Sequence, residues 1–159
     1  MHPRIVNVSF DSAGNIRRTS ESQILTACAQ LTILRIDHVI YFANAEYTVL
    51  KILDIISSQN EYQKYLVLDF KAVSFIDITG VDELERLYDE LKNRGIELKI
   101  VSLHRPVQDV FVSSGFMDKI GKESIFLSYA DCVGKIFKHS DHCKSKDKCP
   151  LRASGFGCN

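Results

Sequence analysis

Residues 75–80 read FIDITG and bring a carboxylate, a hydroxyl and a glycine together between Asp77 and Gly80. Such a group could belong to a phosphoryl-accepting aspartate, an acid protease, a phosphorylation switch or the start of a helix. A phosphoaspartate hydrolase needs a second acid two residues after the first, where this chain has Thr79. An acid protease needs the aspartate directly before Thr-Gly, in two copies that share a proton, but Ile78 intervenes and the motif occurs once. The residues therefore predict a protein that is not an enzyme.

The same residues fit the start of a helix near Val81. Asp77 or Thr79 can accept hydrogen bonds from the first free amides, and Gly80 can let the backbone turn. A helix start at the carboxyl end of a strand can also present amides to an anion or to an acidic group of a partner. We expect Asp77, Ile78, Thr79 and Gly80 to form a helix start that is also an interaction loop for an anion or a partner.

The C-terminal tail holds the other candidate ligands, His139, His142, Cys143 and Cys149. Histidine and cysteine are good zinc ligands. However, the spacing H-x2-H-C-x5-C lacks the paired C-x2-C knuckles of structural zinc sites, which argues against a metal site. Residues 138–159 are polar, rich in lysine and without apolar periodicity. We expect them to form a flexible basic tail that is solvated rather than bound to an anionic membrane surface.

Other motifs for cofactors and catalysis are absent from the sequence. There is no G-x-G-x-x-G after a strand and no G-x-x-x-x-G-K-S/T, the two common phosphate-binding loops. His38 and His104 stand beside expected strand ends, but no serine or cysteine is arranged with them in a nucleophile motif. The sequence therefore predicts no cofactor.

Apolar periodicity places these residues on an alternating series of strands and helices. Asn44 is placed to cap the first helix, and Gly95 follows the longest helix where a left-handed residue is favoured. That helix carries two acid-first i,i+4 pairs, Asp82–Arg86 and Glu90–Arg94. The expected strands are 4–10, 31–36, 39–42, 65–70, 97–103 and 124–127. The expected helices begin near 44, 81, 105 and 128.

The order of these elements predicts an α/β or α+β fold with a mixed sheet and crossover helices. The length of 159 residues and the 45% hydrophobic content suit one domain. We expect an N-terminal strand and mobile polar loop at 1–30, a core at 31–137, and the tail at 138–159.

The overall charge and the cysteines restrict the partners and the compartment. Lysine plus arginine and aspartate plus glutamate both number 20, so the net charge is zero and a nucleic-acid partner is not expected. No apolar run approaches the roughly 18 residues that cross a bilayer, and the N-terminus lacks a secretory h-region. The five cysteines are odd in number and irregularly spaced, which favours a reducing compartment. By itself the chain is expected to be soluble and intracellular.

Three stretches together resemble a known family. These are VIYFANAEY, then YLVLDFKAVSFIDITGVDELERLYDELKNRGIELKIVSL, then RPVQDVFVSSGF. In this order they resemble a STAS domain (sulfate transporter and anti-sigma factor antagonist), from about Leu31 to Phe137, with DITGV as the central signature. The resemblance implies the SpoIIAA-like fold, a mixed central sheet with about four helices.

Two branches of this family differ in function. In one, small antagonists of anti-sigma factors are switched off by phosphorylation of a serine directly after the signature aspartate. Ile78 has that position here. Because isoleucine has no hydroxyl, it cannot be phosphorylated, and Thr79 is not the family's acceptor. In the other, the domain is the cytoplasmic C-terminal part of SulP anion permeases. The segments YFANAEY and HPRIVNVSF are similar to that branch.

The resemblance therefore implies a non-catalytic cytoplasmic STAS domain of a SulP-type sulfate or related anion transporter, contributing to regulation, assembly or transport. Its implied partner is the membrane core of the same polypeptide, which this chain lacks, at the cytoplasmic face of the inner or plasma membrane. A homodimer and a nucleotide or protein regulator stay open as further partners. The alternatives are a free-standing antagonist-like signalling protein, which Ile78 disfavours, and a small-ligand sensor that uses the amides near Thr79 and Gly80.

Overall fold

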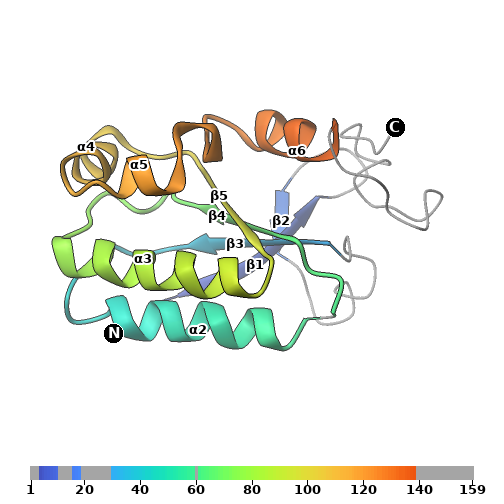
Figure 1. The fold of residues 1–159 in the computed structure, drawn as a ribbon, viewed down its shortest axis with the longest axis horizontal. Coiled ribbons are helices and arrows are strands. Elements are labelled where there is room, and N and C mark those ends of the chain that lie inside the picture. Colours follow the sequence, from blue (N-terminus) through green and yellow to red (C-terminus); the bar gives the residue numbers. More distant parts are fainter. Residues whose placement is uncertain (1–3, 11–15, 19–29, 60, 139–159) are drawn as a thin grey trace.

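The computed structural model describes residues 4–10, 16–18, 30–59 and 61–138 of the chain. Six strands form one mixed sheet in the order β2-β1-β3-β4-β5-β6 (Figure 1). Strands β3 to β6 are parallel, and β1 pairs antiparallel with both β2 and β3. The strands are β1 (Ile5–Phe10), β2 (Ile16–Arg18), β3 (Leu31–Ile36), β4 (Tyr65–Asp69), β5 (Glu97–Val101) and β6 (Ile125–Phe126). The expected mixed sheet of an α/β fold is confirmed.

Helices cover both faces of this sheet. In Figure 1, α2 and α3 lie side by side on one face and α6 lies on the other. Helices α4 and α5 contribute buried residues to the same core as α2 and α3. The helices are α2 (Ala45–Ser57), α3 (Ile78–Asn93), α4 (Arg105–Ser113), α5 (Phe116–Ile120) and α6 (Tyr129–Lys138), with a 3-10 turn η1 (Lys122–Ser124). The sequence predicted the positions of four helices, but not α5 or η1.

The two cores follow from the alternation of side chains along each strand. In β3, Leu34 and Ile36 face the core beneath α2 and α3, whereas Leu31 and Ile33 face the core beneath α6. Successive strand residues point to opposite faces, so a strand covered on both sides must be apolar at nearly every position. This explains the continuous apolar run of β4, which lies at the centre of the parallel strands.

The predicted strand at 39–42 is wrong. Within this segment Ile40 alone pairs, in an isolated parallel bridge with Ile76, and residues 42–44 form a turn before α2. Apolar and β-branched residues favour a strand, but pairing requires a neighbouring strand, and here the neighbour is a single residue of the loop after β4.

Asn44 does not cap α2 with its side chain. Its Oδ1 instead accepts a hydrogen bond from the Tyr41 amide at 3.0 Å, and its Nδ2 donates to the Val39 carbonyl at 2.8 Å. Asn44 therefore fixes the loop before the helix, because a short polar side chain can bond local backbone groups in competition with a cap.

The end of α3 was predicted correctly. Gly95 has a left-handed φ of 71°, and the Ile96 amide donates to the Leu91 carbonyl at 2.8 Å, as in a Schellman motif. The predicted Glu90–Arg94 pair is present, with the nearest N and O atoms 3.0 Å apart. Arg86 pairs with Glu83 and not with Asp82 as expected.

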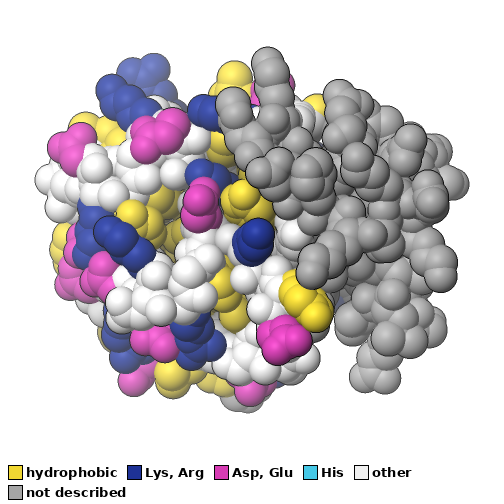
Figure 2. All heavy atoms as spheres, turned by 45° about the vertical axis from the view of Figure 1, so that its right-hand side comes forward, with side chains coloured by type: hydrophobic (Ala, Val, Ile, Leu, Met, Phe, Trp, Pro, Cys, Tyr) yellow, Lys and Arg dark blue, Asp and Glu magenta, His cyan; other side chains and the backbone are white. Residues whose placement is uncertain are grey.

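Charges of both signs are mixed on one face of the described structure. On the face seen in Figure 2, Lys and Arg are interspersed with Asp and Glu, and neither sign forms one continuous area. Within the described ranges, no helix is both long and apolar enough to span a bilayer. His139, His142, Cys143 and Cys149, and most of the loop expected to be mobile, lie outside the described residues.

Candidate functional site

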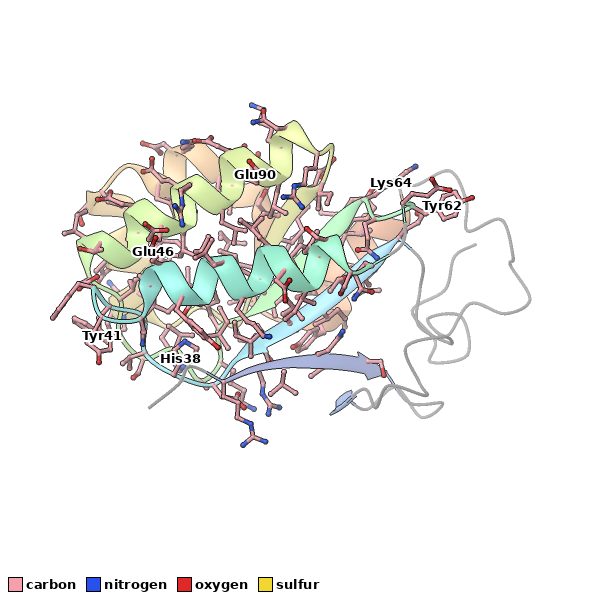
Figure 3. The ribbon with its side chains drawn as sticks, turned by 90° about the horizontal axis from the view of Figure 1, so that it is seen from below. His38, Tyr41, Glu46, Tyr62, Lys64 and Glu90 are labelled. Carbon is pink, nitrogen blue, oxygen red and sulfur yellow. The ribbon has the colours of Figure 1, made fainter. Side chains whose placement is uncertain are left out.

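The loops after β3 and β4 lie side by side at the carboxyl end of the parallel strands. The Ile40 amide donates to the Phe75 carbonyl at 3.1 Å, and the Asp77 amide donates to the Ile40 carbonyl at 3.2 Å. Helices α2 and α3 follow directly, so both begin at this end. Figure 3 shows His38, Tyr41 and Glu46 here, with Tyr62 and Lys64 at the opposite end. The motif FIDITG is thus one half of a two-loop structure.

Asp77 joins the two halves with one carboxylate. It is the N-cap of α3, with Oδ1 accepting a hydrogen bond from the Gly80 amide at 2.8 Å. Oδ2 accepts a second bond, at 2.9 Å, from the amide of Phe42 in the other loop. The predicted capping role of Asp77 is confirmed, although the helix begins at Ile78 rather than near Val81. The contact with Phe42 links residues 35 positions apart, and no local sequence signal indicated it.

Gly80 serves close packing and not a turn. It lies in the first turn of α3, is buried, and is not among the residues with positive φ. A Cβ atom there would lie 2.6 Å from Ile76 Cγ1 and 3.0 Å from Ile40 Cγ2. The expectation that Gly80 lets the backbone turn is therefore wrong. The residue allows α3 to begin directly against the paired isoleucines of the two loops.

Three large apolar side chains of these loops face outward. Phe42 is 72% exposed, Ile78 59% and Phe75 53%, while Ile40 and Ile76 between them are buried. We call Phe42, Phe75 and Ile78 the signature patch. Thr79 is exposed beside it, and the described structure gives its hydroxyl no hydrogen bond. Grouped exposed apolar residues of this kind are typical of contact surfaces.

The two histidines have structural contacts. His38 Nε2 lies 3.0 Å from the hydroxyl of Thr48, which is buried and donates to the Asn44 carbonyl at 2.8 Å. Burial lowers the pKa of His38 below its ordinary value. The nearby Arg4 carbonyl and the charge of Asp37 act in the opposite direction but are weaker. His104 Nε2 lies 2.6 Å from the Lys71 carbonyl. His38 therefore braces the start of α2, and His104 braces the loop after β4.

A buried acid, Asp69, lies at the end of β4 on the α6 side, and sequence reasoning had not singled it out. Tyr129 of α6 donates its hydroxyl hydrogen to Asp69 Oδ2 at 2.6 Å, and the Lys71 amide donates to Oδ1 at 2.8 Å. Burial and this carboxylate raise the pKa of Tyr129 well above its ordinary value. Each oxygen of Asp69 has a donor, so the contacts give it a structural role, holding α6 on the sheet. The signal in the sequence was an acid that ends an apolar strand.

Within the described residues, no three His, Cys, Asp or Glu side chains are grouped closely enough to hold a metal ion. The one cysteine that the structure describes as free, Cys132, is buried in the core beneath α6. Burial raises the pKa of its thiol to about 12, so the reactive thiolate is disfavoured. The candidate site is therefore the two-loop structure with its outward apolar side chains.

Residues 21–132 match the family model of the STAS domain. The chain belongs to the STAS domain family. "Probable sulfate transporter 3.5" of Arabidopsis thaliana is 36% identical over 101 residues, which cover 64% of this chain and 16% of that protein. The chain spans between 16% and 20% of the length of the curated sulfate transporters that it matches.

Solved structures share the STAS fold. The murine Solute Carrier 26 family member A9 anion transporter has a TM-score of 0.70 at 21% identity, over 82% of this chain and 22% of that one. The SulP transporter STAS domain from Vibrio cholerae has a TM-score of 0.53 at 21% identity, over 64% and 82%. The anti-sigma factor antagonist SpoIIAA has a TM-score of 0.56 at 17% identity, over 71% and 93%. At these identities the likeness shows the fold alone, which confirms the expected SpoIIAA-like architecture.

Proposed function

We propose that this STAS domain is part of a SulP-type transporter of sulfate or a related inorganic anion. In this proposal it lies at the cytoplasmic face of the membrane and contributes, without catalysis, to regulation, assembly or transport. One observation carries the proposal: the match to a plant sulfate transporter, at 36% identity, covers 64% of this chain and only 16% of that protein. The partner is then the membrane core of the same polypeptide. Residues 31–137 form the domain core, 1–30 the connection to it, and 138–159 the tail.

The geometry of the loop 77–80 supports a contact role. Both oxygens of Asp77 accept hydrogen bonds from backbone amides, so its carboxylate already has a structural function. Gly80 is packed against Ile76, and Ile78 projects outward. A loop whose polar groups hold the backbone and whose apolar side chain faces solvent suits binding to another protein surface better than chemistry.

The second candidate is a free-standing antagonist-like signalling protein, favoured by the likeness to SpoIIAA over 93% of that chain. The resemblance places the phosphorylated serine of antagonists at Ile78, which has no hydroxyl. Incubating the chain with an anti-sigma kinase and labelled ATP tests this candidate. Absence of label on the wild type, with label on Ile78→Ser, would remove it while showing that the kinase recognises the domain.

Cell fractionation tests the first candidate directly. An antibody against residues 31–137 is used on membranes and supernatant from native cells. The proposal expects a membrane-bound band far larger than the 18.0 kDa of this chain. A band near 18.0 kDa in the supernatant alone would contradict it and favour the signalling protein.

A further inference from the structure

We infer that the signature patch docks a protein segment whose apolar side chains are flanked by lysine or arginine. Because it names the chemistry of the partner that the loop 77–80 would contact, the inference rests on the proposed function. Three properties of the two-loop structure support it. Hydrogen bonds hold the backbone that carries the apolar side chains, Glu46 and Asp82 near them take part in no ion pair within the described residues, and the carboxylate of Asp77 already bonds an amide at the start of α3.

Backbone contacts hold the two loops that carry the apolar side chains. The Ile40–Ile76 bridge sets the two loops in register, and alternation along the bridged segment turns Ile76 inward and Phe75 outward. The hydrogen bond from the Phe42 amide to Asp77 holds Phe42 beside the start of α3, where Ile78 is the first helical residue. A surface held in its binding geometry before association loses less conformational entropy on binding.

Two carboxylates border this patch. Asp82 lies one turn after Ile78 on α3, and i,i+4 residues share a helix face. Glu46 lies in the first turn of α2, four positions after Phe42, and Figure 3 shows it at the same end of the molecule as Tyr41. Both residues are exposed. An apolar surface with acids at its border is complementary to an apolar segment flanked by basic residues.

These two acids differ from the other acids of the same helices. Glu83, Glu90 and Asp54 each lie within ion-pair distance of a basic side chain three or four residues away. Among the described residues, Glu46 and Asp82 take part in no ion pair. Lys71 lies at the far end of the loop after β4, four positions before Phe75. The charge on the α2 and α3 side of the patch is therefore negative and available to a partner.

A small anion is a poorer occupant of this site. The start of α3 could attract an anion through its free amides and its dipole. The carboxylate of Asp77 already accepts from the Gly80 amide there and brings its own negative charge. The acids at the border add to the repulsion. The observations therefore favour a basic, apolar protein segment over phosphate or a nucleotide.

Two synthetic peptides test the inference with the full chain. One is built from two copies of Leu-Lys-Lys-Leu-Leu-Lys-Leu, and the other has glutamate in place of every lysine. Amide NMR spectra locate binding, and calorimetry at low and high salt measures the dissociation constant. The lysine peptide is expected to shift amides of the loops 39–47 and 74–82. The glutamate peptide is expected to bind at least about tenfold more weakly, since like charges oppose it.

Matched variants separate the patch from general surface attraction. Phe42→Ser together with Ile78→Ser should weaken the lysine peptide about tenfold or more, as expected for central apolar contacts. Glu46→Gln with Asp82→Asn should weaken it by about three- to tenfold and reduce its salt dependence. Leu127→Ser, at a position that is 90% exposed, and Asp109→Asn on α4 are the controls and should leave binding unchanged.

Three outcomes would overturn the inference: equal binding of both peptides, shifts centred away from the two loops, or equal loss in the control variants. Binding of neither peptide would also overturn it. None of these results bears on the size or the membrane association of the native protein, so failure of the docking surface and failure of the proposed function can be told apart by fractionation.

Discussion

Replacing Asp77 tests whether one carboxylate holds the two loops together. Asp77→Ala removes the N-cap bond to Gly80 and the bond from the Phe42 amide. Loss of an N-cap costs about 1 kcal/mol, and loss of a bond to a partly exposed charged acceptor costs about 1.5 kcal/mol. We therefore expect the free energy of unfolding to fall by about 2 to 3 kcal/mol, a large share of the about 5 to 15 kcal/mol of a typical domain.

Asp77→Asn separates the two bonds. Asparagine caps helices about as well as aspartate, so the bond to Gly80 can be kept. Its single amide oxygen then leaves an NH2 group facing the Phe42 amide, and two donors cannot bond each other. We expect a loss of about 1 to 2 kcal/mol from this broken link. The remaining difference between the two variants is then the contribution of the cap.

Urea unfolding gives the stabilities, and amide hydrogen exchange reports the loops. Both variants should unfold at lower urea with an unchanged m-value, and the Phe42 amide should exchange faster in each. Asp109→Ala, at an exposed α4 position, is the control and should change stability by less than about 0.5 kcal/mol. If Asp77→Asn matched the wild type in stability and in Phe42 exchange, the bond across the loops would have no energetic role.

Three further perturbations follow from the same structure. Gly80→Ala should lower the free energy of unfolding by about 1 to 3 kcal/mol through overpacking, despite a gain of about 1 kcal/mol in helix propensity. Gly134→Ala on α6 is the control, because a Cβ there meets nothing within 4 Å, and it should show the gain in helix propensity alone. Equal changes of melting temperature in the Gly80 and Gly134 variants would contradict the packing argument. Tyr129→Phe leaves Asp69 Oδ2 without its donor and should cost about 1 to 3 kcal/mol, with faster amide exchange in α6. Unchanged exchange in α6 would show that this bond does not anchor the helix. Since burial lowers the pKa of His38 below 6.5, the unfolded chain binds the proton more readily, so stability should fall as the pH drops below about 6.5. His38→Gln should flatten this dependence in urea titrations at several pH values, and an identical slope would exclude His38 as its source.

The elements that the sequence predicted well have local causes. The apolar stripe of α3 repeats at helical spacing, and Gly95 ends the helix because a residue without Cβ adopts a left-handed φ at little cost. β4 was recognisable because a strand covered on both faces is apolar at nearly every position. Asp77 could be predicted as a cap because its bond to the Gly80 amide spans three residues. The family could be recognised because its signature lies in one continuous stretch.

The predictions that failed depended on partners whose positions the sequence pattern does not give. The apolar segment 39–42 has the composition of a strand, but its one bridge is made with Ile76, in another loop. Asparagine is a residue type that favours N-cap positions. The side chain of Asn44 instead bonds the Tyr41 amide and the Val39 carbonyl of its own turn. Gly80 was expected to turn the chain, whereas the side chains of Ile40 and Ile76 leave no room for a Cβ. In each case the missing information was the position of a neighbour.

The sequence alone determined most of the strand and helix order, the mixed sheet, the STAS family and the absence of a hydroxyl at Ile78, because periodicity and motifs are properties of adjacent residues. It missed β2, α5 and η1 and added a strand at 39–42. The tertiary structure decided that the exposed residues Phe42, Phe75 and Ile78 lie on two loops that hydrogen-bond to each other. These loops meet because parallel strands end at the same edge of the sheet, and Asp77 accepts an amide 35 residues away. Contacts across that distance depend on how the strands pair, and local sequence patterns do not record such pairing.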